Sequence, residues 1–436
     1  MSRSEEVRDF YERMPYPGPV ASLGPDRTLY ADPEHRRAHF HLTWPTEQSR
    51  GDLKILIAGC GTSQAAKYAL REPSAQITAI DLSETSVRHT RDLQQKHNLD
   101  NLELHQLPIE RVQELGRSFD LIVCTGVLHH LPDPDAGLRA LRDVLRPQGA
   151  MRLMVYARYG RTGIYMMQEY CRLLDIGVSD NDLRDLGDAL AALPANHPIS
   201  GILRRAKDFR RPEAMADALL HPQDRAYTVP ELYAWLDRCG ISFGRWIEQA
   251  PYLAQCGALT DSPHATRLAS LPSRQQHAAV ELFRGTMDSH SFIAYRDDRF
   301  GESQPISFLG DSWRDYVPIP LPRTVCVRER LPIGSVAVLI NRSHKFPDLI
   351  FTVDAFEDRL LGAIDGKRTL AEIVQCATQV NDGKRALRFF ERLWRYDQVV
   401  FDASRTVPGP QNGEFPDLAG GQTASQADRT SSEGYP

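Results

Sequence analysis

The stretch LKILIAGCGTSQ, residues 53–64, decides the fold of this chain. Its first half, LKILIA, is almost wholly apolar, as expected for a strand that is covered on both faces of a parallel sheet. A Gly-Cys-Gly turn follows directly, at the carboxyl end of that strand, where open parallel sheets bind their ligands. Glycine permits the positive φ angles and the close backbone approach that such a turn requires. The stretch therefore predicts a buried strand followed by a ligand-binding turn.

Outward from this stretch, apolar runs alternate with amphipathic runs as far as residue 156. This alternation is typical of a parallel sheet wound with helices on both faces. The expected strands cover residues 53–58, 76–80, 102–106, 119–125 and 150–156, and the expected helices cover residues 63–71, 83–97, 110–116 and 135–145. Two later runs, ISFGRWIEQA (241–250) and HSFIAYR (290–296), predict strands that complete the sheet. The fold class is therefore α/β.

An acidic residue follows the second expected strand, at Asp81. A carboxylate at this position, about twenty residues after the glycine turn, can accept hydrogen bonds from both ribose hydroxyls of an adenosine-containing cofactor. The Gly-x-Gly-x-x-Gly fingerprint of dinucleotide sites is broken, because Gln64 stands at the third glycine position. The pattern thus favours a nucleoside cofactor and gives no sign of an anchored pyrophosphate.

Further along the chain, the run FDLIVCTGVLHHLPDP (119–134), followed by LRDVLRPQGAMRLMV (141–155), resembles the class I S-adenosylmethionine-dependent methyltransferases. The resemblance covers about residues 50–160. It implies a Rossmann-like, seven-stranded methyltransferase sheet, S-adenosyl-L-methionine as the cofactor, and transfer of its methyl group to a nitrogen or an oxygen of an acceptor that the sequence does not identify.

The same resemblance implies which residues hold the cofactor. The turn Gly59-Cys60-Gly61 would pack against its methionine part, and Asp81 would hold the ribose. Leu82 would cover one face of the adenine. The edge of the adenine would be lined by Leu107, Pro108 and Ile109, and the methionine and sulfonium would lie over Thr125, Gly126 and Val127.

Two positions depart from the family pattern. Many relatives carry an acid two residues before the first glycine, where this chain has Ile57, and a third glycine where it has Ser63. Loss of that acid removes the expected partner of the cofactor's ammonium group. Another group must satisfy the ammonium, or binding is weaker.

The chemistry asks for few protein groups. A sulfonium methyl is already activated, so transfer needs an aligned nucleophile, and a base only where the acceptor is protonated. Tyr11 and Tyr16 on the arm FYERMPYPG (10–18), and Tyr159 at the mouth, are possible bases. The catalytic candidates that we select are His130, Tyr156 and Tyr16. For each of the two histidines 129 and 130, a structural role is an open alternative to catalysis and is the favoured one for a single histidine. The arm is either a lid over the cofactor or a helix packed on the sheet.

Changes in composition along the chain suggest its domain organisation. The expected segments are an N-terminal helix and aromatic, proline-stiffened arm (1–50), the cofactor-binding core (51–160), a helical insertion with the late strands (161–300), a proline-rich linker (301–325), a winged-helix-like domain of three helices and a strand (326–402), and a disordered tail (403–436) that has too few large apolar residues to order itself.

The whole arrangement also resembles, more loosely, bacterial protein-lysine methyltransferases with a regulatory domain. The matching runs are YTVPELYAWLDRCGI (227–241) and ELFRGTMDSHSFIAYR (281–296). This resemblance implies a protein acceptor, with the winged-helix-like domain either holding that protein or acting as a structural cap. In the expected helix RALRFFERLWR (385–395) large apolar residues dominate, which favours a core helix over a DNA-reading one.

Composition excludes several other classes. A net charge of −5 without a Lys/Arg-rich run makes nucleic acid an unlikely partner. The seven cysteines are odd in number and never spaced as Cys-x-x-Cys, which argues against disulfides and a zinc site and favours a cytoplasmic location. We expect no bound metal. We expect neither a membrane span nor an export signal, because no apolar run is long enough for either.

Three hypotheses remain open at this level. The leading one is a methyltransferase that acts on a nitrogen or an oxygen, possibly of a protein side chain. The second is a methyltransferase with a small-molecule acceptor, which an enclosed apolar mouth formed by the insertion would favour. The third is a cofactor-binding scaffold or sensor without catalysis. The oligomeric state is not indicated.

Overall fold

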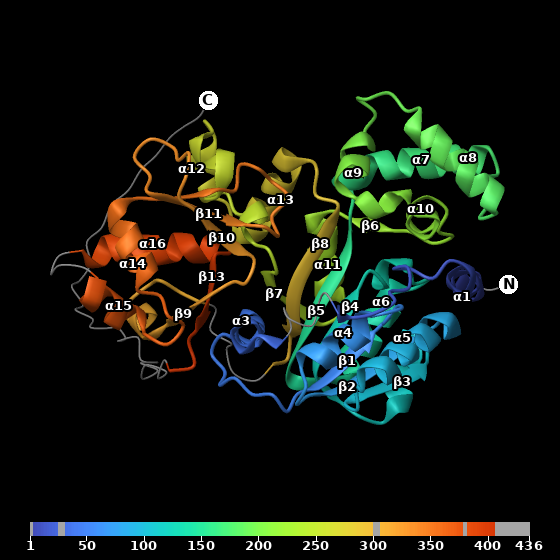
Figure 1. The fold of residues 1–436 in the computed structure, drawn as a ribbon, viewed down its shortest axis with the longest axis horizontal. Helices are drawn as coiled ribbons and strands as arrows, with labels where there is room; N and C mark the ends of the chain where they lie inside the picture. The colour runs from blue at the N-terminus through green and yellow to red at the C-terminus, as the bar shows by residue number, and fades with distance from the viewer. Residues whose placement is uncertain (1–2, 25–30, 300–305, 378–381, 406–436) are drawn as a thin grey trace, which may run out of the picture.

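A mixed eight-stranded sheet forms the centre of the molecule (Figure 1). The computed structural model describes residues 3–24, 31–299, 306–377 and 382–405. Seven strands follow the order β3-β2-β1-β4-β5-β8-β7, and the short β6 pairs with β5. Their bounds are β1 Lys54–Ala58, β2 Gln76–Asp81, β3 Leu102–Gln106, β4 Phe119–Thr125, β5 Leu145–Ala157, β6 Ala226–Tyr227, β7 Ile241–Trp246 and β8 Ser289–Arg296. The predicted Rossmann-like, seven-stranded methyltransferase sheet is confirmed, with β6 as an unpredicted addition.

The strand directions explain where a ligand can bind. Strands β1 to β6 pair in parallel, whereas β8 runs antiparallel to both β5 and β7. The carboxyl ends of β1, β2, β4 and β5 therefore meet at one edge of the sheet. Because the strand order reverses between β1 and β4, the turn at the end of β1 lies beside this switch point, which is the usual ligand position in such sheets.

Helices cover both faces of the sheet, as the nearly all-apolar central strands require. On one face lie helices whose apolar residues share a core with the sheet: α3 Pro33–Thr43, α4 Gln64–Arg71 and α5 Glu84–His97. On the other face lie η1 Ile109–Leu115, α6 Pro134–Val144, α11 Val229–Arg238 and α13 Ser273–Arg284. The expected helix at 110–116 is thus a 3-10 helix, and the others form close to their predicted bounds.

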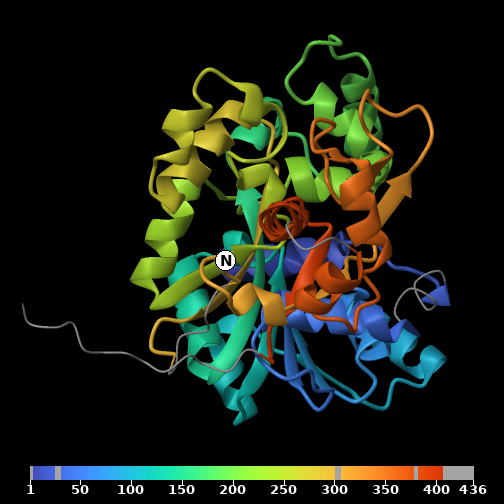
Figure 2. The same ribbon diagram turned by 90° about the vertical axis from the view of Figure 1, so that its left-hand side faces the viewer.

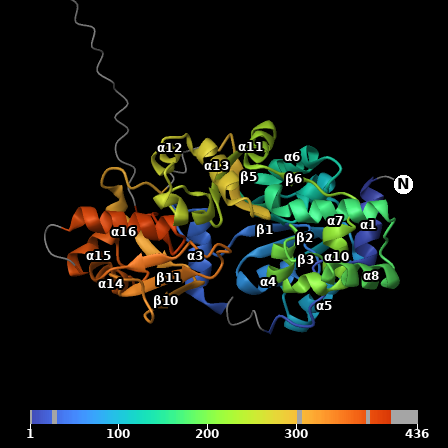
Figure 3. The same ribbon diagram turned by 90° about the horizontal axis from the view of Figure 1, so that it is seen from above.

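The insertion after β5 forms a helical layer of its own. It contains α7 Thr162–Leu173, α8 Asp180–Ala191, α9 Ser200–Arg205 and α10 Pro212–Leu219. These helices share a small core with Phe10 of the N-terminal helix α1, Arg3–Arg13. Figure 3 shows α1 beside α7, α8 and α10 at one end of the molecule. The N-terminal helix therefore joins the insertion to the core.

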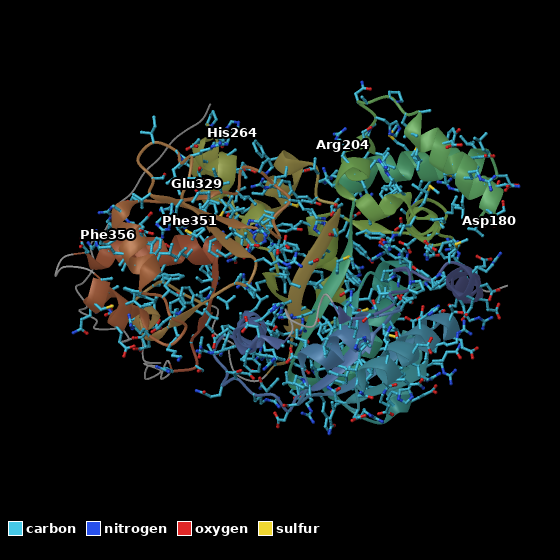
Figure 4. The ribbon with its side chains drawn as sticks, viewed as in Figure 1. Asp180, Arg204, His264, Glu329, Phe351 and Phe356 are labelled. Atoms are coloured by element: carbon cyan, nitrogen blue, oxygen red, sulfur yellow. The ribbon has the colours of Figure 1, made fainter. Side chains whose placement is uncertain are left out.

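The C-terminal unit lies at the opposite end. Figure 4 places Phe351 and Phe356 of this unit far from Asp180 of α8. In Figure 2, where the unit faces the viewer, its last helix is seen nearly end-on. Its elements are β9 Val317–Pro320, β10 Thr324–Val327, β11 Ala337–Asn341, β12 Phe351–Val353, α14 Ala355–Gly362, α15 Leu370–Ala377, α16 Gly383–Arg395 and β13 Val399–Asp402.

Part of the expected C-terminal organisation differs in the structure. The three predicted helices and the final strand are present, but a three-stranded sheet, β10-β11-β12, precedes the helices. The stretch 301–325 is more than a linker, because β9 pairs with β13 and buries Val317 and Ile319 completely. Most of the predicted tail, from residue 406 onward, lies outside the described residues.

Helix α3 was not predicted, since it lies within the expected arm, and it links the core to the C-terminal unit. Asp32 caps it by accepting a hydrogen bond from the Glu34 amide, and Pro33 occupies its first turn, both typical of a helix start. Arg37 donates to Asp402 of β13 at 2.9 Å, and the Ala403 amide donates to the Pro45 carbonyl at 2.7 Å.

In the described part of the chain, no helix is both long and apolar enough to cross a bilayer.

Candidate active site

A cavity of about 400 Å³ opens at the carboxyl edge of the central sheet. It lies at the ends of β1, β2, β4 and β5, beneath the N-terminal arm and beside α10. Its lining includes every residue expected to hold the cofactor, namely Gly59, Cys60, Gly61, Asp81, Leu82, Leu107, Pro108, Ile109, Thr125, Gly126 and Val127, and all three catalytic candidates, Tyr16, His130 and Tyr156. The fold thus brings together residues that are spread over more than a hundred positions of the sequence.

The glycine turn adopts a conformation that only glycine takes without strain. Gly59 and Gly61 have φ angles of +76° and +53°. A Cβ on Gly59 would stand 2.3 Å from a methyl carbon of Val127, so the turn and the residue after β4 are in direct contact. The amides of Gly59 and Cys60 both donate to the Ile80 carbonyl of β2, which holds the turn against the neighbouring strand. The floor of the cavity is therefore fixed backbone.

Asp81 is held in one orientation by its own backbone surroundings. One carboxylate oxygen accepts from the Gly61 amide at 2.8 Å, and the other accepts from the Ser83 amide at 2.9 Å. Burial raises the pKa of Asp81, and the two amide bonds oppose that rise. Each oxygen keeps a further lone pair, and the side chain lines the cavity. This is the geometry that two adjacent hydroxyls of a sugar can use.

At the β5 end of the cavity, two tyrosine hydroxyls meet one buried carboxylate. Tyr11 donates to Asp217 at 3.0 Å, and Tyr156 donates to the other oxygen of Asp217 at 3.3 Å. Burial raises the pKa of Asp217, and burial followed by the Asp217 charge raises the pKa of both tyrosines well above their ordinary value. The tyrosines are therefore neutral hydrogen-bond donors at physiological pH and poor bases.

His130 stands beside this group with one ring nitrogen unused. Its Nδ1 lies 2.6 Å from the Gln223 carbonyl, which can only accept, so Nδ1 carries the proton in the neutral ring. Its Nε2 is buried and has no hydrogen-bond partner. The His221 ring packs against it at 3.9 Å, and burial lowers the pKa of His221 to about 2. Because the neutral ring carries its proton on Nδ1, Nε2 of His130 has a free lone pair in that form.

Sequence reasoning missed Asp217, which comes from α10 of the insertion. It is 3% exposed and stands among alanine, methionine and leucine in PEAMADAL. The available signal was an acid inside the apolar run AMADAL, because the other acid of the helix, Glu213, lies in its first turn. Arg161 was also missed. Its guanidinium lies 3.5 Å from the centre of the Tyr156 ring and pairs with Asp224 at 3.1 Å, so it fixes the ring from its far side.

The N-terminal arm closes over the cavity. The Glu12 carboxylate accepts from the Glu84 and Thr85 amides, at 2.6 and 3.1 Å, at the start of α5. Thr62, next to the glycine turn, donates to the Pro17 carbonyl at 2.7 Å. Ser4, Val7, Tyr11, Tyr16 and Pro17 all line the cavity. Helix α1 thus packs on α5 and on the insertion, and side chains of the arm line the site.

Four other residues that the sequence singled out, at positions 57, 63, 129 and 159, do not line the cavity. Tyr159 is 38% exposed on η3, Tyr159–Arg161, and does not line the cavity, so its expected place at the mouth is wrong. His129 is completely buried against Tyr156. Ile57 is buried within β1, and Ser63 precedes α4 without a side-chain capping bond. Among the described residues, no cluster of three or more histidine, cysteine or acidic side chains is arranged to hold a metal ion.

Comparison with known proteins agrees with this geometry. Residues 56–151 match a family described as a methyltransferase domain. An uncharacterized protein of Synechococcus sp. is 36% identical over 313 residues, which are 68% of this chain and 72% of that protein. A ubiquinone biosynthesis O-methyltransferase of Acinetobacter baumannii is 26% identical over 182 residues, 38% of this chain and 76% of the enzyme.

Among solved structures, PKMT2 from Rickettsia typhi, in complex with AdoHcy, superposes with a TM-score of 0.57 over 84% of this chain and 73% of that one. The sequence identity is 15%, so this likeness concerns the fold. Together with the sheet order and the family match, these findings show that the chain belongs to the class I S-adenosylmethionine-dependent methyltransferases. It is an enzyme of that class, and its cofactor is S-adenosyl-L-methionine.

Proposed function

We propose that the cofactor lies across the carboxyl edge of the sheet, from β2 toward β5. Asp81 accepts from the ribose hydroxyls, Leu82 covers one face of the adenine, and the turn Gly59-Cys60-Gly61 packs against the methionine part. The adenine edge meets Leu107, Pro108 and Ile109, and the sulfonium lies over Thr125, Gly126 and Val127. Three points support this assignment: these residues share one cavity, the glycine turn leaves no Cβ in it, and Asp81 keeps lone pairs for hydroxyl donors.

We further propose that the acceptor presents an amine nitrogen at the β5 end. The observation that carries this proposal is Asp217, a buried carboxylate that faces the cavity between Tyr11 and Tyr156. None of the ion pairs between described residues involves Asp217. Its charge attracts an ammonium group, and an acceptor without a positive charge would leave this carboxylate uncompensated. Oxygen acceptors are the alternative.

An ammonium must lose a proton before it can attack. His130 is placed to take that proton, because its neutral ring has an unpartnered lone pair on Nε2. The cofactor supplies an activated methyl group on a positively charged sulfur. The amine lone pair forms the new bond to the methyl carbon, and the electrons of the broken carbon–sulfur bond return to sulfur. Tyr156 and Tyr16 position the acceptor in this proposal, and neither acts as the base.

We infer that the acceptor is a small molecule. The cavity is bordered by the arm and by α10 of the insertion, which leave it partly open, and no described residue of the C-terminal unit lines it. Such a cavity suits a small acceptor, whereas a protein acceptor would need an open groove. A protein side chain is the alternative, and similarity of fold to PKMT2 is its support.

A labelling experiment separates these acceptors. The purified protein is incubated with a cell lysate and S-adenosylmethionine carrying a radioactive methyl group, and the products are divided by size. We expect the label in the small-molecule fraction, where amine-containing products carry it in an acid-stable form. Label in the protein fraction would favour the protein acceptor, and label in neither fraction, with cofactor bound, would favour a scaffold without catalysis.

The variant Asp217→Asn tests the amine proposal directly. It keeps the size of the side chain and removes its charge, so methyl transfer to the identified acceptor should fall by about 10²-fold or more. Cofactor affinity, measured by calorimetry, should be unchanged. Asp185→Asn on the exposed side of α8 is the matched control. Unchanged transfer by Asp217→Asn would contradict the proposal.

The C-terminal unit, which we interpret as winged-helix-like, is proposed to be a structural module that does not bind nucleic acid. Helix α16 buries Phe389, Phe390 and Leu393 completely. Three of its arginines, at 385, 392 and 395, are paired with acidic side chains at 2.7, 2.7 and 2.6 Å. These pairs and the buried face leave little of α16 for phosphate contacts.

A cytoplasmic location is proposed on the basis of the cysteines. All seven are free thiols in the structure, and five of them are buried. Buried free thiols are typical of proteins that work in a reducing compartment.

A further inference from the structure

A second cavity, of about 230 Å³, lies at the opposite edge of the same sheet. It is formed near the amino ends of β1 and β4, between α3 and the end of α4. It shares no lining residue with the catalytic cavity. Five arginines line it, Arg36, Arg37, Arg50, Arg71 and Arg152, whereas Glu72 is its one acidic lining residue.

Arg152 carries a buried charge that forms no salt bridge with a carboxylate of the described residues, although the Glu72 charge lies near enough to act on it. It is 6% exposed and projects from β5 into the space below α3. Its Nε donates to Thr43 Oγ1 at 3.0 Å, and its two terminal nitrogens donate to His39 Nδ1 at 2.9 Å and to the His39 carbonyl at 2.7 Å. Burial, reinforced by the Arg152 charge, lowers the pKa of His39 well below its ordinary value. Tyr68 is a further hydrogen-bond partner of Arg152, and its pKa is lowered because the Arg71 and Arg152 charges outweigh burial. None of these partners is a carboxylate.

The remaining acids near the cavity are already engaged. Glu72 is bonded to Arg71 at 3.0 Å. Asp402 pairs with Arg37 at 2.9 Å. Asp120 pairs with Arg50 at 2.9 Å and also with an arginine outside the cavity. The structure therefore contains no acid bonded to Arg152 among the described residues.

One hydrogen-bond donor in the same cavity lacks an acceptor. Trp44 lines the cavity and is 3% exposed, and its indole Nε1 has no hydrogen-bond partner among the described residues. A buried donor without an acceptor costs about 1–3 kcal/mol, and a buried unpaired charge costs more. Arg152, which has hydrogen bonds but no salt bridge, and Trp44, whose indole N–H lacks an acceptor, line the same cavity, and a negatively charged oxygen ligand would serve both.

We propose that this cavity is a binding site for a small molecule that carries a phosphate or carboxylate group. A planar guanidinium matches both groups with two parallel hydrogen bonds. The cavity is too small for a folded partner and has the polar, basic lining that an oxyanion requires. Phe40 and Trp44 add apolar surface beside the charge. This site is distinct from the cofactor site and does not depend on the identity of the methyl acceptor.

Calorimetry on the full-length protein tests the site with two probes, inorganic phosphate and malonate. Each is titrated against a chloride background of equal ionic strength, so that general screening is constant. Binding of phosphate alone assigns the site to phosphorylated ligands, and binding of malonate alone assigns it to carboxylates. If neither anion binds, the proposal is overturned.

Two variants locate the binding. Arg152→Met removes the buried charge and is expected to abolish anion binding. Because this change lies in the sheet, the half-exposed Arg36→Ala serves as a second test, with an expected loss of about tenfold in affinity. Arg359→Ala is the matched control, since Arg359, like Arg36, donates to a backbone carbonyl earlier in the chain, four residues away for Arg359 and five for Arg36, and Arg359 lies outside the cavity. Equal affinity for Arg36→Ala, Arg359→Ala and the unaltered protein would overturn the proposal.

Discussion

Asp81 shows how a single residue is prepared for its ligand by the backbone around it. The amides of Gly61 and Ser83 hold its two oxygens from opposite sides, so the carboxylate loses little conformational freedom when a ligand binds. The glycine turn is part of this arrangement, because Gly61 supplies one of the two amides. Turn and acid therefore form one unit, although twenty residues separate them.

The variant Asp81→Asn is expected to weaken S-adenosylmethionine binding by about tenfold or more, because hydrogen bonds to a charged acceptor contribute roughly 1.5–3 kcal/mol. Calorimetry measures the dissociation constant. Asp100→Asn, on the exposed turn before β3, should bind like the unaltered protein. An unchanged constant for Asp81→Asn would remove this carboxylate from the cofactor site.

His130 gives a second prediction at the residue scale. His130→Gln can keep a hydrogen bond to the Gln223 carbonyl but cannot take a proton. Methyl transfer should therefore fall by about 10²–10⁴-fold, with cofactor affinity preserved. Stopped assays with the identified acceptor measure the rate, and calorimetry measures the cofactor affinity. A variant that keeps the full rate would show that His130 is only structural.

At the scale of elements, the contact between α1 and α5 decides whether the site is covered. Glu12 acts as a cap from outside the helix, since its carboxylate accepts from the first amides of α5, where the helix dipole favours negative charge. Burial would raise the pKa of Glu12, but the hydrogen bonds from Thr85 and Glu84 outweigh it, and the pKa is lowered. The contact is therefore complete at neutral pH and is lost as the pH falls through this lowered pKa.

Glu12→Gln is expected to loosen the arm at neutral pH. Trypsin should cut faster after Arg13, and S-adenosylmethionine should bind more weakly, because Tyr11, Tyr16 and Pro17 would cover the site for less of the time. Limited proteolysis followed by mass spectrometry measures the first effect. Glu6→Gln, on the exposed face of the same helix, is the control. Equal cutting rates in both variants would show that the carboxylate does not hold the arm.

At the scale of the whole molecule, the junction between the core and the C-terminal unit contains buried charge. Asp397 accepts from Arg245 at 3.2 Å and from the Ala250 amide at 2.9 Å, and His344 lies 3.1 Å from it. Beside this group, Glu248 is half-buried, and burial raises its pKa to about 7, although His344, Lys345 and Arg323 oppose the rise and Asp397 adds to it. The junction is thus sensitive to pH.

Glu248→Gln is expected to raise the melting temperature above pH 7. A raised pKa in the folded state means that Glu248 stabilises the fold fully below its unfolded pKa of about 4.3, and that this contribution is lost as the pH rises to about 7. Above pH 7 the buried charge costs up to roughly 3 kcal/mol, which glutamine avoids. Calorimetric scans from pH 5 to pH 8 should show a difference that grows with pH. Glu329→Gln, at an exposed position of the C-terminal unit (Figure 4), is the control, and a pH-independent difference for Glu248→Gln would contradict the prediction.

Much of the core could be predicted from the sequence because its signals are local. Strands β3 and β4 have their predicted bounds: β4, FDLIVCT, is a nearly all-apolar run, and β3, LELHQ, begins with alternating apolar and polar residues, and both patterns are typical of strands. Helix α3 could have been predicted from Asp32 and Pro33, but the surrounding aromatic and proline residues concealed it. The sequence signal for the short strands β10 to β12 is weak, because these strands are stabilised by pairing with each other and by packing on α14 and α16.

The sequence by itself determined the sheet, the glycine turn, Asp81 and hence the cofactor, because each depends on residues close together in the chain or on spacing within one βαβ unit. Only the tertiary structure placed Asp217 between Tyr11 and Tyr156 and showed the unused nitrogen of His130, because these contacts join segments up to about two hundred positions apart. The basic cavity around Arg152 has the same origin. Charge compensation depends on distances in space, and no pattern along the chain records it.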